Sequence, residues 1–341
     1  MAGHYSDGTK WIPCYWTGTT RIDLPGNSMD LAHAAEAWRP SVYGDTIYIG
    51  HGQYYDGTKQ VHCCWTITGG SATRMDFAGG PGWTDAVTQN GYSSMGTRYV
   101  PGYWTDVTSC TPCFWKVEGS TITRTDLTPT SSGGRSMASA IFFDGTSIYA
   151  AGWYYNGAKY VPCYWVNNGA PVPLPVPNDQ TWDFSVTVWG LWVSNRSIYL
   201  SGDYWDSVKS IQIPCFWTVS GGSITRTDLS DGTHNAWAAL CDFSTGTLYT
   251  SGNWDDGTKS IPCFWVGTMR TDLPADSMNH AHVSYAGDFI FAGGKVFVCG
   301  EFYDGTKQVP CYWTIQGTTI SRTDFSGDGL HDAFEGNMCL Y

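Results

Sequence analysis

The chain has 341 residues, with 18 Lys and Arg against 30 Asp and Glu, so its net charge at pH 7 is −12. Nucleic-acid recognition needs a positive surface, so this charge argues against a nucleic-acid partner. Aromatic residues make up 16% of the chain and charged residues only 14%, which is typical of β-strands buried on both faces. No apolar run reaches the roughly 20 residues that span a bilayer, so we expect no membrane insertion.

A unit with a Cys-x-Trp triplet recurs seven times along the chain, and x is aromatic in six of the seven copies. The tryptophans of these triplets are Trp16, Trp65, Trp115, Trp165, Trp217, Trp265 and Trp313. Their intervals are 48 to 52 residues, and a fixed period of this size indicates a propeller, a solenoid or an array. The chain shows no linker, charge run or change of composition, so we expect residues 1–341 to form a single domain with no second one.

The second full repeat shows how each period divides into strands. Residues 34–43 form a first predicted strand, rich in small residues, and residues 46–55 form a second. An Asp-Gly pair then predicts a hairpin turn, and residues 61–68 and 72–77 form the third and fourth strands. Four antiparallel strands per unit make a propeller blade. We therefore predict an all-β protein, a seven-bladed β-propeller of four-stranded antiparallel blades.

Two repeats and the chain ends depart from this pattern. The third repeat lacks the Gly and Lys of the turn, and the fourth ends in the proline-rich run 171–177, which suits an outer edge strand. Residues 331–341 read as a first strand running into the start of a second, and residues 1–5 read as the rest of that second strand. We therefore expect the N- and C-terminal segments to pair in one shared blade and to close the ring without an open sheet edge.

Seven of the 12 cysteines occupy the same position in successive repeats. Equivalent positions on different blades lie well beyond the roughly 7 Å Cα separation that a disulfide allows. We predict that all seven are reduced and buried: Cys14, Cys63, Cys113, Cys163, Cys215, Cys263 and Cys311. Cys110 and Cys113 have the spacing of a redox or zinc half-site, but no second pair and no following His accompany them, so we interpret them as structural.

The repeat has a resemblance to a known bacterial unit. Pro-Cys-Tyr-Trp, a Gly, Arg-Thr-Asp-Leu or Arg-Thr-Asp-Phe, and an apolar strand ending in Gly together resemble the HAF repeat, in which His-Ala-Phe-x-Trp, an Asn-Gly turn and Asp-Leu follow one another. Here Cys63 stands for the alanine and His62 keeps the histidine. The resemblance implies a bacterial tandem-repeat β-propeller with an extracellular or cell-surface location and an obscure biochemical role. If the N-terminus is native, we expect a cytoplasmic location, because residues 1–10 contain no signal peptide.

Arg-x-Asp pairs, such as Arg124 with Asp126 and Arg226 with Asp228, lie on one face of the predicted fourth strand in six of the seven repeats. A functional interpretation would make them six ligand sites. Residues needed once per blade to cross-link strands or to cap a turn would look the same, and we favour this structural interpretation.

Candidate site residues lie in the loops that lead from the fourth strand of one blade to the first strand of the next. In propellers these loops converge on one mouth of the channel, and five of the eight histidines fall in them. The predicted ligand-binding residues are the histidines His33, His234, His282 and His331, the polar residues Asp30, Asn235 and Asp332, and the aromatic residues Trp83, Trp182 and Trp237. Such groups in a concave mouth suit a metal or a sugar. The alternative is that His, Asp and Asn cap loops and bind backbone without any ligand.

The sequence shows no nucleophile, base and orienting residue in a recognisable motif, so we favour a non-enzymatic, monomeric binding propeller. Its ligand would be a carbohydrate or a protein surface at the loop-rich channel mouth, and we expect no cofactor. One alternative is a metal-dependent hydrolase or lyase, in which His33, His234, His282 and His331 are candidate ligands of a divalent cation in the channel. A second alternative is a structural or assembly module.

Overall fold

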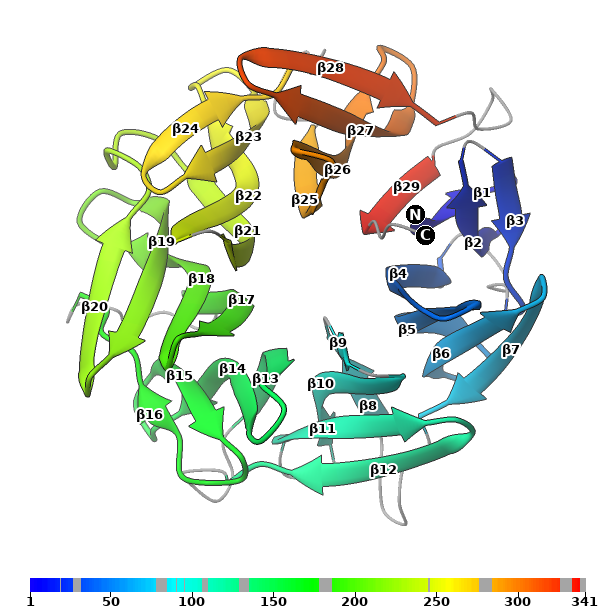
Figure 1. Cartoon of the computed structure of the whole chain (residues 1–341), viewed down its shortest axis with the longest axis horizontal. Helices are drawn as coiled ribbons and strands as arrows, with labels where there is room; N and C mark the ends of the chain where they lie inside the picture. The colour runs from blue at the N-terminus through cyan, green and yellow to red at the C-terminus, as the bar shows by residue number, and fades with distance from the viewer. Residues whose placement is uncertain are drawn as a thin grey trace. The chain divides into compact units, whose positions relative to one another are not determined.

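A computed structural model describes residues 1–18, 20–26, 32–77, 85–89, 91–94, 96–105, 110–128, 135–177, 186–244, 246–275, 284–325 and 333–337. These residues form seven antiparallel sheets, and the fold is an all-β, seven-bladed β-propeller (Figure 1). The predicted fold class is therefore confirmed. Within these ranges, no helix is long and apolar enough to cross a bilayer.

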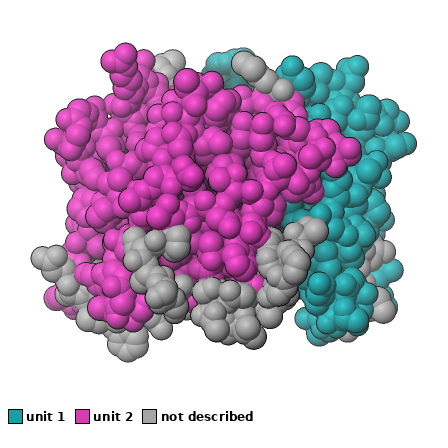
Figure 2. Space-filling view, turned by 90° about the horizontal axis from the view of Figure 1, so that it is seen from below, with its two compact units in different colours: residues 1–78, 258–262, 272–341 teal, residues 79–257, 263–271 magenta. Residues whose placement is uncertain are grey.

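Contacts divide the chain into two compact units (Figure 2). Unit 1 comprises residues 1–78, 258–262 and 272–341, and unit 2 comprises residues 79–257 and 263–271. The expectation of one domain over residues 1–341 stays a prediction.

The blades are numbered here in chain order, and unit 1 holds blades 1, 2 and 7. Blade 1 is β29 (Ala333–Asn337), β1 (Ala2–Ser6), β2 (Trp11–Thr17) and β3 (Thr20–Asp23). Blade 2 is β4 (Glu36–Tyr43), β5 (Thr46–Tyr55), β6 (Gln60–Thr68) and β7 (Ser71–Asp76). Blade 7 is β25 (Tyr285–Ala292), β26 (Lys295–Tyr303), β27 (Gln308–Gln316) and β28 (Thr319–Asp324).

Unit 2 holds blades 3, 4 and 5 and most of blade 6. Blade 3 is β8 (Asp85–Thr88), β9 (Tyr92–Ser94), β10 (Thr97–Thr105), β11 (Cys110–Glu118) and β12 (Thr121–Asp126). Blade 4 is β13 (Ser136–Phe143), β14 (Ile148–Tyr155), β15 (Tyr160–Val166) and β16 (Val172–Pro173). Blade 5 is β17 (Val186–Ser194), β18 (Ser197–Asp206), β19 (Ile211–Ser220) and β20 (Ser223–Asp228). Blade 6 is β21 (Ala236–Ser244), β22 (Thr247–Asp255), β23 (Ser260–Val266) and β24 (Met269–Asp272).

Blade 3 departs from the predicted four strands, because its first strand is split into β8 and β9, which both pair with β10. The split falls beside Pro101 of β10, whose carbonyl accepts the N–H of Gln89 at 2.7 Å. Proline has no backbone N–H to donate to the neighbouring strand, so the hydrogen-bonded pairing is interrupted at that point. The proline-rich strand β16 is an edge strand of two residues, as the sequence predicts.

Blade 1 contains strands from both ends of the chain. Strand β29 pairs with β1 in antiparallel fashion, with Ala333 opposite Tyr5 and Asn337 opposite Ala2. The predicted pairing of the terminal segments in one sheet is therefore present inside unit 1. Closure of the ring by this pairing stays a prediction.

The repeated Gly, Cys and Trp form the core of each blade, as blade 2 illustrates. Gly52 lies opposite Cys63, and a Cβ at Gly52 would collide with the ring of Trp65 and with the carbonyl of Glu36. Trp65 is fully buried, and its indole N–H donates to the carbonyl of Pro25 in the chain that crosses from blade 1, at 2.9 Å. The repeat therefore conserves a glycine because only glycine admits this approach.

The seven repeat cysteines are buried, and no disulfide joins the cysteines in the described ranges. Burial raises the pKa of thiols such as those of Cys14 and Cys63 well above the ordinary value. The prediction of small, buried hydrophobic cysteines is therefore confirmed for this part of the chain.

The Arg-x-Asp pairs bridge the second and fourth strands of their blades. In blade 2 the guanidinium of Arg74 lies 3.9 Å from the ring centroid of Tyr54 and 2.8 Å from a carboxylate oxygen of Asp76. The hydroxyl of Tyr54 donates to the other oxygen at 3.0 Å. The contact between the guanidinium and an aromatic ring recurs in blades 1, 3, 5 and 7, with Arg21, Arg124, Arg226 and Arg322. This arrangement agrees with a structural role.

Candidate functional site

The structure describes four of the ten predicted site residues. His33 lies in unit 1, and His234, Asn235 and Trp237 lie in unit 2. The other six predicted residues, Asp30, Trp83, Trp182, His282, His331 and Asp332, lie outside the described residues. An arc of four histidines therefore stays a prediction.

The contacts of His33 and Asn235 are ring stacking and hydrogen bonds to backbone N–H groups. The imidazole of His33 stacks on Tyr55, with ring centroids 3.7 Å apart. The side-chain oxygen of Asn235 accepts the N–H of Gln212 at 2.8 Å, and its carbonyl accepts the N–H of Asp255 at 2.8 Å. Asn235 thus accepts one backbone N–H from blade 5 and one from blade 6, as the loop-capping alternative supposes.

The chain that crosses from blade 5 to blade 6, residues 230–234, folds like a hairpin turn. One oxygen of Asp231 accepts the N–H of Thr233 at 3.0 Å and its hydroxyl at 2.7 Å. Asp56 makes the same two bonds to Thr58 in the hairpin of blade 2. The bonds from Thr233 lower the pKa of Asp231, and the nearby charges of His234 and Arg270 act in the same direction.

In this crossing chain, the carbonyl that accepts the tryptophan N–H lies one residue closer to the preceding strand than in other crossings. The indole N–H of Trp265 donates to the carbonyl of Leu229, the first residue after Asp228. In the crossings to blades 2, 4 and 7 the accepting carbonyl belongs to the second residue after the final Asp: Pro25, Thr128 and Pro274. The difference frees residues 230–234 to form their own turn above blade 6.

A cavity of about 160 Å³ lies under this turn, entirely within unit 2. The residues that give it its chemistry are Ser230, Asp231, Thr233, His234, Trp254 and Arg270. Blade 2 has less room at the matching place, because a Cβ on Gly26 would lie 3.1 Å from Arg74 and 3.3 Å from Tyr54. The crossing chain there packs directly on the Arg-aromatic pair.

The cavity combines hydrogen-bond donors with acceptors. The guanidinium of Arg270 lies 3.5 Å from the ring centroid of Trp254, so the indole holds it in place. Exposed His234 lies against the hairpin of its own blade, where a Cβ on Gly257 would be 3.3 Å from its ring. No hydrogen bond within the described part of the chain engages the second carboxylate oxygen of Asp231. The site can therefore bind a ligand that both donates and accepts hydrogen bonds.

The sequence prediction identified His234 in this site and missed Asp231, Trp254 and Arg270. A signal was available, because Asp231-Gly232-Thr233-His234 repeats the Asp-Gly-Thr-Lys hairpin motif in a crossing loop, with His in the place of Lys. Trp237, two residues beyond Asn235, is 37% exposed and stays a candidate contact. Among the described residues, no group of three His, Cys, Asp or Glu side chains could hold a metal ion.

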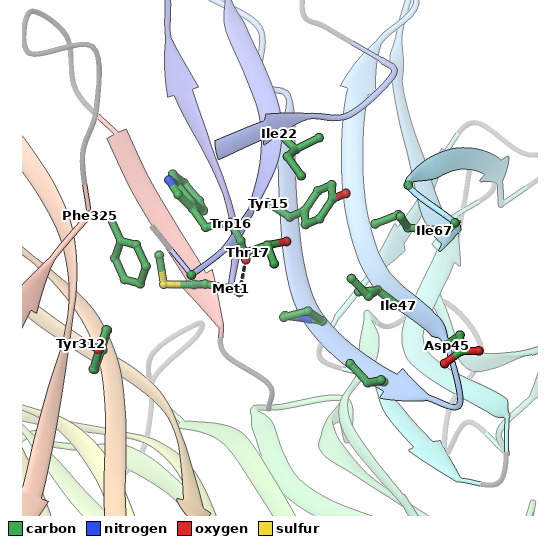
Figure 3. Close-up of a pocket in the computed structure, with 15 residues that line it drawn as sticks. Met1, Tyr15, Trp16, Thr17, Ile22, Asp45, Ile47, Ile67, Tyr312 and Phe325 are labelled. Atoms are coloured by element: carbon green, nitrogen blue, oxygen red, sulfur yellow. Dashed lines mark hydrogen bonds between the residues drawn. The ribbon is translucent and has the colours of Figure 1, made fainter. Parts of the chain in front are cut away.

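A second, larger pocket of about 560 Å³ lies within unit 1 (Figure 3). Aliphatic and aromatic side chains dominate its wall, among them Tyr15, Ile22, Ile47, Ile67 and Phe325. Its apolar lining differs from the polar lining of the blade 6 cavity, and the sequence did not indicate it.

No family model matches the sequence, and no curated protein matches it at a significant level. Among solved structures, the chain is similar to a polysaccharide lyase, an ulvan lyase, with a TM-score of 0.53 and 12% identity over 83% of this chain and 81% of the lyase. The acylaminoacyl peptidase of Pyrococcus horikoshii matches with a TM-score of 0.50 and 9% identity over 86% of this chain and 46% of the peptidase. The Aleuria aurantia lectin in complex with Fucα1-6GlcNAc matches with a TM-score of 0.42 and 11% identity over 83% of this chain and 94% of the lectin. These identities show the propeller fold alone, and the resemblance to HAF repeats stays a prediction.

Proposed function

We propose that this protein is a binding propeller that recognises a carbohydrate, and that one sugar unit occupies the blade 6 cavity. The observation that carries the proposal is the convergence of the Asp231 carboxylate, the Arg270 guanidinium and the His234 imidazole on one cavity. Neighbouring sugar hydroxyls both donate and accept hydrogen bonds, so they suit a carboxylate beside a guanidinium.

The size of the cavity limits the ligand to one small ring. A volume of about 160 Å³ is below the roughly 300 Å³ of the smallest pockets for drug-sized ligands. It equals the volume of about five water molecules at roughly 30 Å³ each. A single sugar ring of a longer glycan fits this size, and the rest of the glycan would lie outside on the loop-rich face.

The metal-dependent alternative rests on His282 and His331, which lie outside the described residues, together with His33 and His234, which belong to different units. Metal content after purification would test it separately. The carbohydrate proposal uses no metal and no group beyond the described cavity.

A glycan array probed with the folded chain tests the proposal, followed by calorimetric titration with the best glycan. His234→Ala should weaken binding about fivefold, because one net hydrogen bond is worth about 1 kcal/mol. Lys59→Ala is the matched control, because Lys59 holds the same turn position in blade 2 without a comparable cavity. An array with no binding glycan, or equal losses in the two variants, would contradict the proposal.

A further inference from the structure

A buried carboxylate, Asp203, lies in blade 5 beside the strand whose first residue lines the blade 6 cavity. Asp203 belongs to strand β18 and is only 2% exposed. Within the described part of the chain its carboxylate has two hydrogen-bond partners, and both are donors. Trp189 of β17 donates its indole N–H at 3.0 Å, and Gln212 of β19 donates from its side-chain amide. Two donors suit an ionised carboxylate, which can only accept.

The strands packed on β18 bring no positive charge to Asp203. They are β17 and β19 of the same blade and β21 of blade 6, to which the hydroxyl of Ser201 donates at the carbonyl of Ala239, at 3.1 Å (Figure 1). The ionisable residues of these strands and of β18 itself are Cys215, Cys241, Asp242, Tyr199, Tyr204 and Asp206. Burial therefore raises the pKa of Asp203 to about 7, and the two donated bonds only reduce this shift.

Gln212 also holds the start of the cavity wall. Its backbone N–H donates to the side-chain oxygen of Asn235 at 2.8 Å. The two residues on either side of Asn235, His234 and Ala236, both line the cavity. The hydrogen bonds of Asp203 therefore continue through Gln212 to the backbone that carries two wall residues.

Protonation of Asp203 changes the hydrogen bond that Gln212 can make with it. A neutral carboxylic acid has one O–H to donate, and the indole N–H of Trp189 cannot accept it. The amide of Gln212 can accept it by turning over and presenting its oxygen in place of its N–H. Gln212 thus has one arrangement for each charge state of Asp203, and the described arrangement is the one that suits the carboxylate.

We propose that Asp203 is a positioning residue whose charge state controls the affinity of the blade 6 cavity through Gln212 and Asn235. This proposal rests on the carbohydrate site proposed above. Since the described cavity goes with the ionised form, binding is strongest when Asp203 is ionised and weakens when it gains a proton. At the lower end of typical coupling between two sites, the affinity changes about fivefold. Coupling is reciprocal, so a bound glycan favours the ionised form by the same factor.

The coupling can be tested without any glycan, by following N–H signals of the full chain by NMR between pH 5.5 and pH 8.5. The indole signal of Trp189 and the amide signal of Ala236 should shift together, with a midpoint near pH 7. Asp203→Asn should abolish this shared midpoint. Asn235→Ala should abolish it at Ala236 alone, because it cuts the link to the wall, and it keeps the test possible if Asp203→Asn does not fold. An Ala236 signal that titrates as in the parent in both variants would overturn the proposal.

Calorimetric titration with the array-selected glycan measures the consequence for binding. The parent should bind up to about fivefold more weakly at pH 6 than at pH 8. His234 is ionisable as well, so the contribution of Asp203 is the difference between the parental profile and that of Asp203→Asn. Equal profiles in the two proteins would overturn the proposal. An array without a binding glycan would contradict the carbohydrate proposal, whereas the NMR titration would still decide the coupling.

Glu36→Gln provides a matched control in unit 1. Glu36 also accepts hydrogen bonds from a tryptophan indole and a glutamine amide, those of Trp38 at 3.2 Å and Gln53 at 2.9 Å. It has no bond to the chain that carries the cavity wall, so this variant should keep the parental pH profile of binding. A control variant that loses the profile as Asp203→Asn does would show that the effect is not specific to Asp203.

Discussion

Two buried histidines of unit 1 contrast with a buried aspartate of unit 2. In unit 1, burial lowers the pKa of His4 and of His62 to about 4, with nearby Glu36 opposing the shift at His4. In unit 2, burial raises the pKa of Asp203 to about 7, although Gln212 and Trp189 donate hydrogen bonds to its carboxylate. The shared repeat therefore specifies the backbone, and a buried position can carry either a base or an acid.

The contrast is sharpest at one position of the repeat. His4 follows Gly3, and Asp203 follows Gly202, and each of these glycines stands opposite the repeat cysteine of its blade. The same place in two blades therefore carries a buried base in one unit and a buried acid in the other. Each group affects the stability of its own unit, and the two effects have opposite dependence on pH.

The direction follows from proton binding in the folded and unfolded states. Unfolded histidine binds protons near pH 6.5, but His4 and His62 stay neutral in the fold down to about pH 4, so unit 1 loses stability as the pH falls through this window. Unfolded aspartate loses its proton near pH 3.8, but Asp203 keeps its proton in the fold up to about pH 7. Unit 2 therefore loses stability as the pH rises from about 4 to about 7.

The largest expected effect comes from removing the strand that completes blade 1. Deletion of residues 330–341 removes β29 and leaves the inner edge of β1 without its partner. We expect aggregation or a loss of several kcal/mol in unit 1, with much less change in the hydrogen exchange of blades 4 and 5. Calorimetry and hydrogen exchange read by mass spectrometry measure this. A truncated chain that melts like the parent would contradict the predicted closure.

The next largest effect should follow from Asp203→Asn, which removes the buried acid of unit 2. The parent should lose up to about 4 kcal/mol of stability between pH 4 and pH 8, because each unit of pKa shift corresponds to about 1.4 kcal/mol. The variant should lose this pH dependence whatever its absolute stability, since asparagine does not titrate. Urea unfolding at several pH values measures the slope. A variant with the parental slope would show that Asp203 is not its source.

A similar test in unit 1 uses His62→Pro, because the repeat places proline at this position in other blades, such as Pro112 and Pro162. The parent should lose up to about 3 kcal/mol through His62 as the pH falls from 6.5 to 4. The variant should be more stable than the parent at pH 4.5 and similar to it at pH 8. If the two proteins have the same acid transition, His62 does not control the acid response of unit 1.

The smallest effect concerns the loop cap in unit 2. Asn235→Ala removes the acceptor of the Gln212 N–H and should cost about 1 kcal/mol of stability with little effect on glycan binding. Thermal unfolding and titration with the glycan separate these outcomes. A loss of binding at unchanged stability would place Asn235 in the ligand site after all.

The sequence predicts the fold well because the period and the Gly, Cys and Trp positions recur in every blade, and the hairpin-turn motif recurs in most of them. Strand β5 matches its predicted range, and the other strands of blade 2 agree within two residues. The split of the first strand in blade 3 depends on a proline in the neighbouring strand. A prediction made from each strand's own residues does not detect this effect.

The site is harder to predict because its residues repeat elsewhere for structural reasons. Arg270 and Trp254 look like the Arg-aromatic pairs of five other blades, and Asp231 looks like a hairpin aspartate. What distinguishes blade 6 is that the indole N–H of Trp265 donates to a carbonyl one residue earlier in the crossing chain than in blades 2, 4 and 7. Such a shift is set by packing between blades, and neither periodicity nor composition reports it.

The most direct test of the carbohydrate site compares the same aspartate turn in the two units. Asp231→Asn and Asp56→Asn remove the same carboxylate from matching Asp-Gly-Thr turns, one beside the cavity of unit 2 and one in unit 1. Calorimetric titration with the array-selected glycan should show at least tenfold weaker binding for Asp231→Asn and parental affinity for Asp56→Asn, because charge-assisted bonds are worth about 1.5–3 kcal/mol. Parental affinity in both variants would contradict the assignment of the blade 6 cavity as the sugar site.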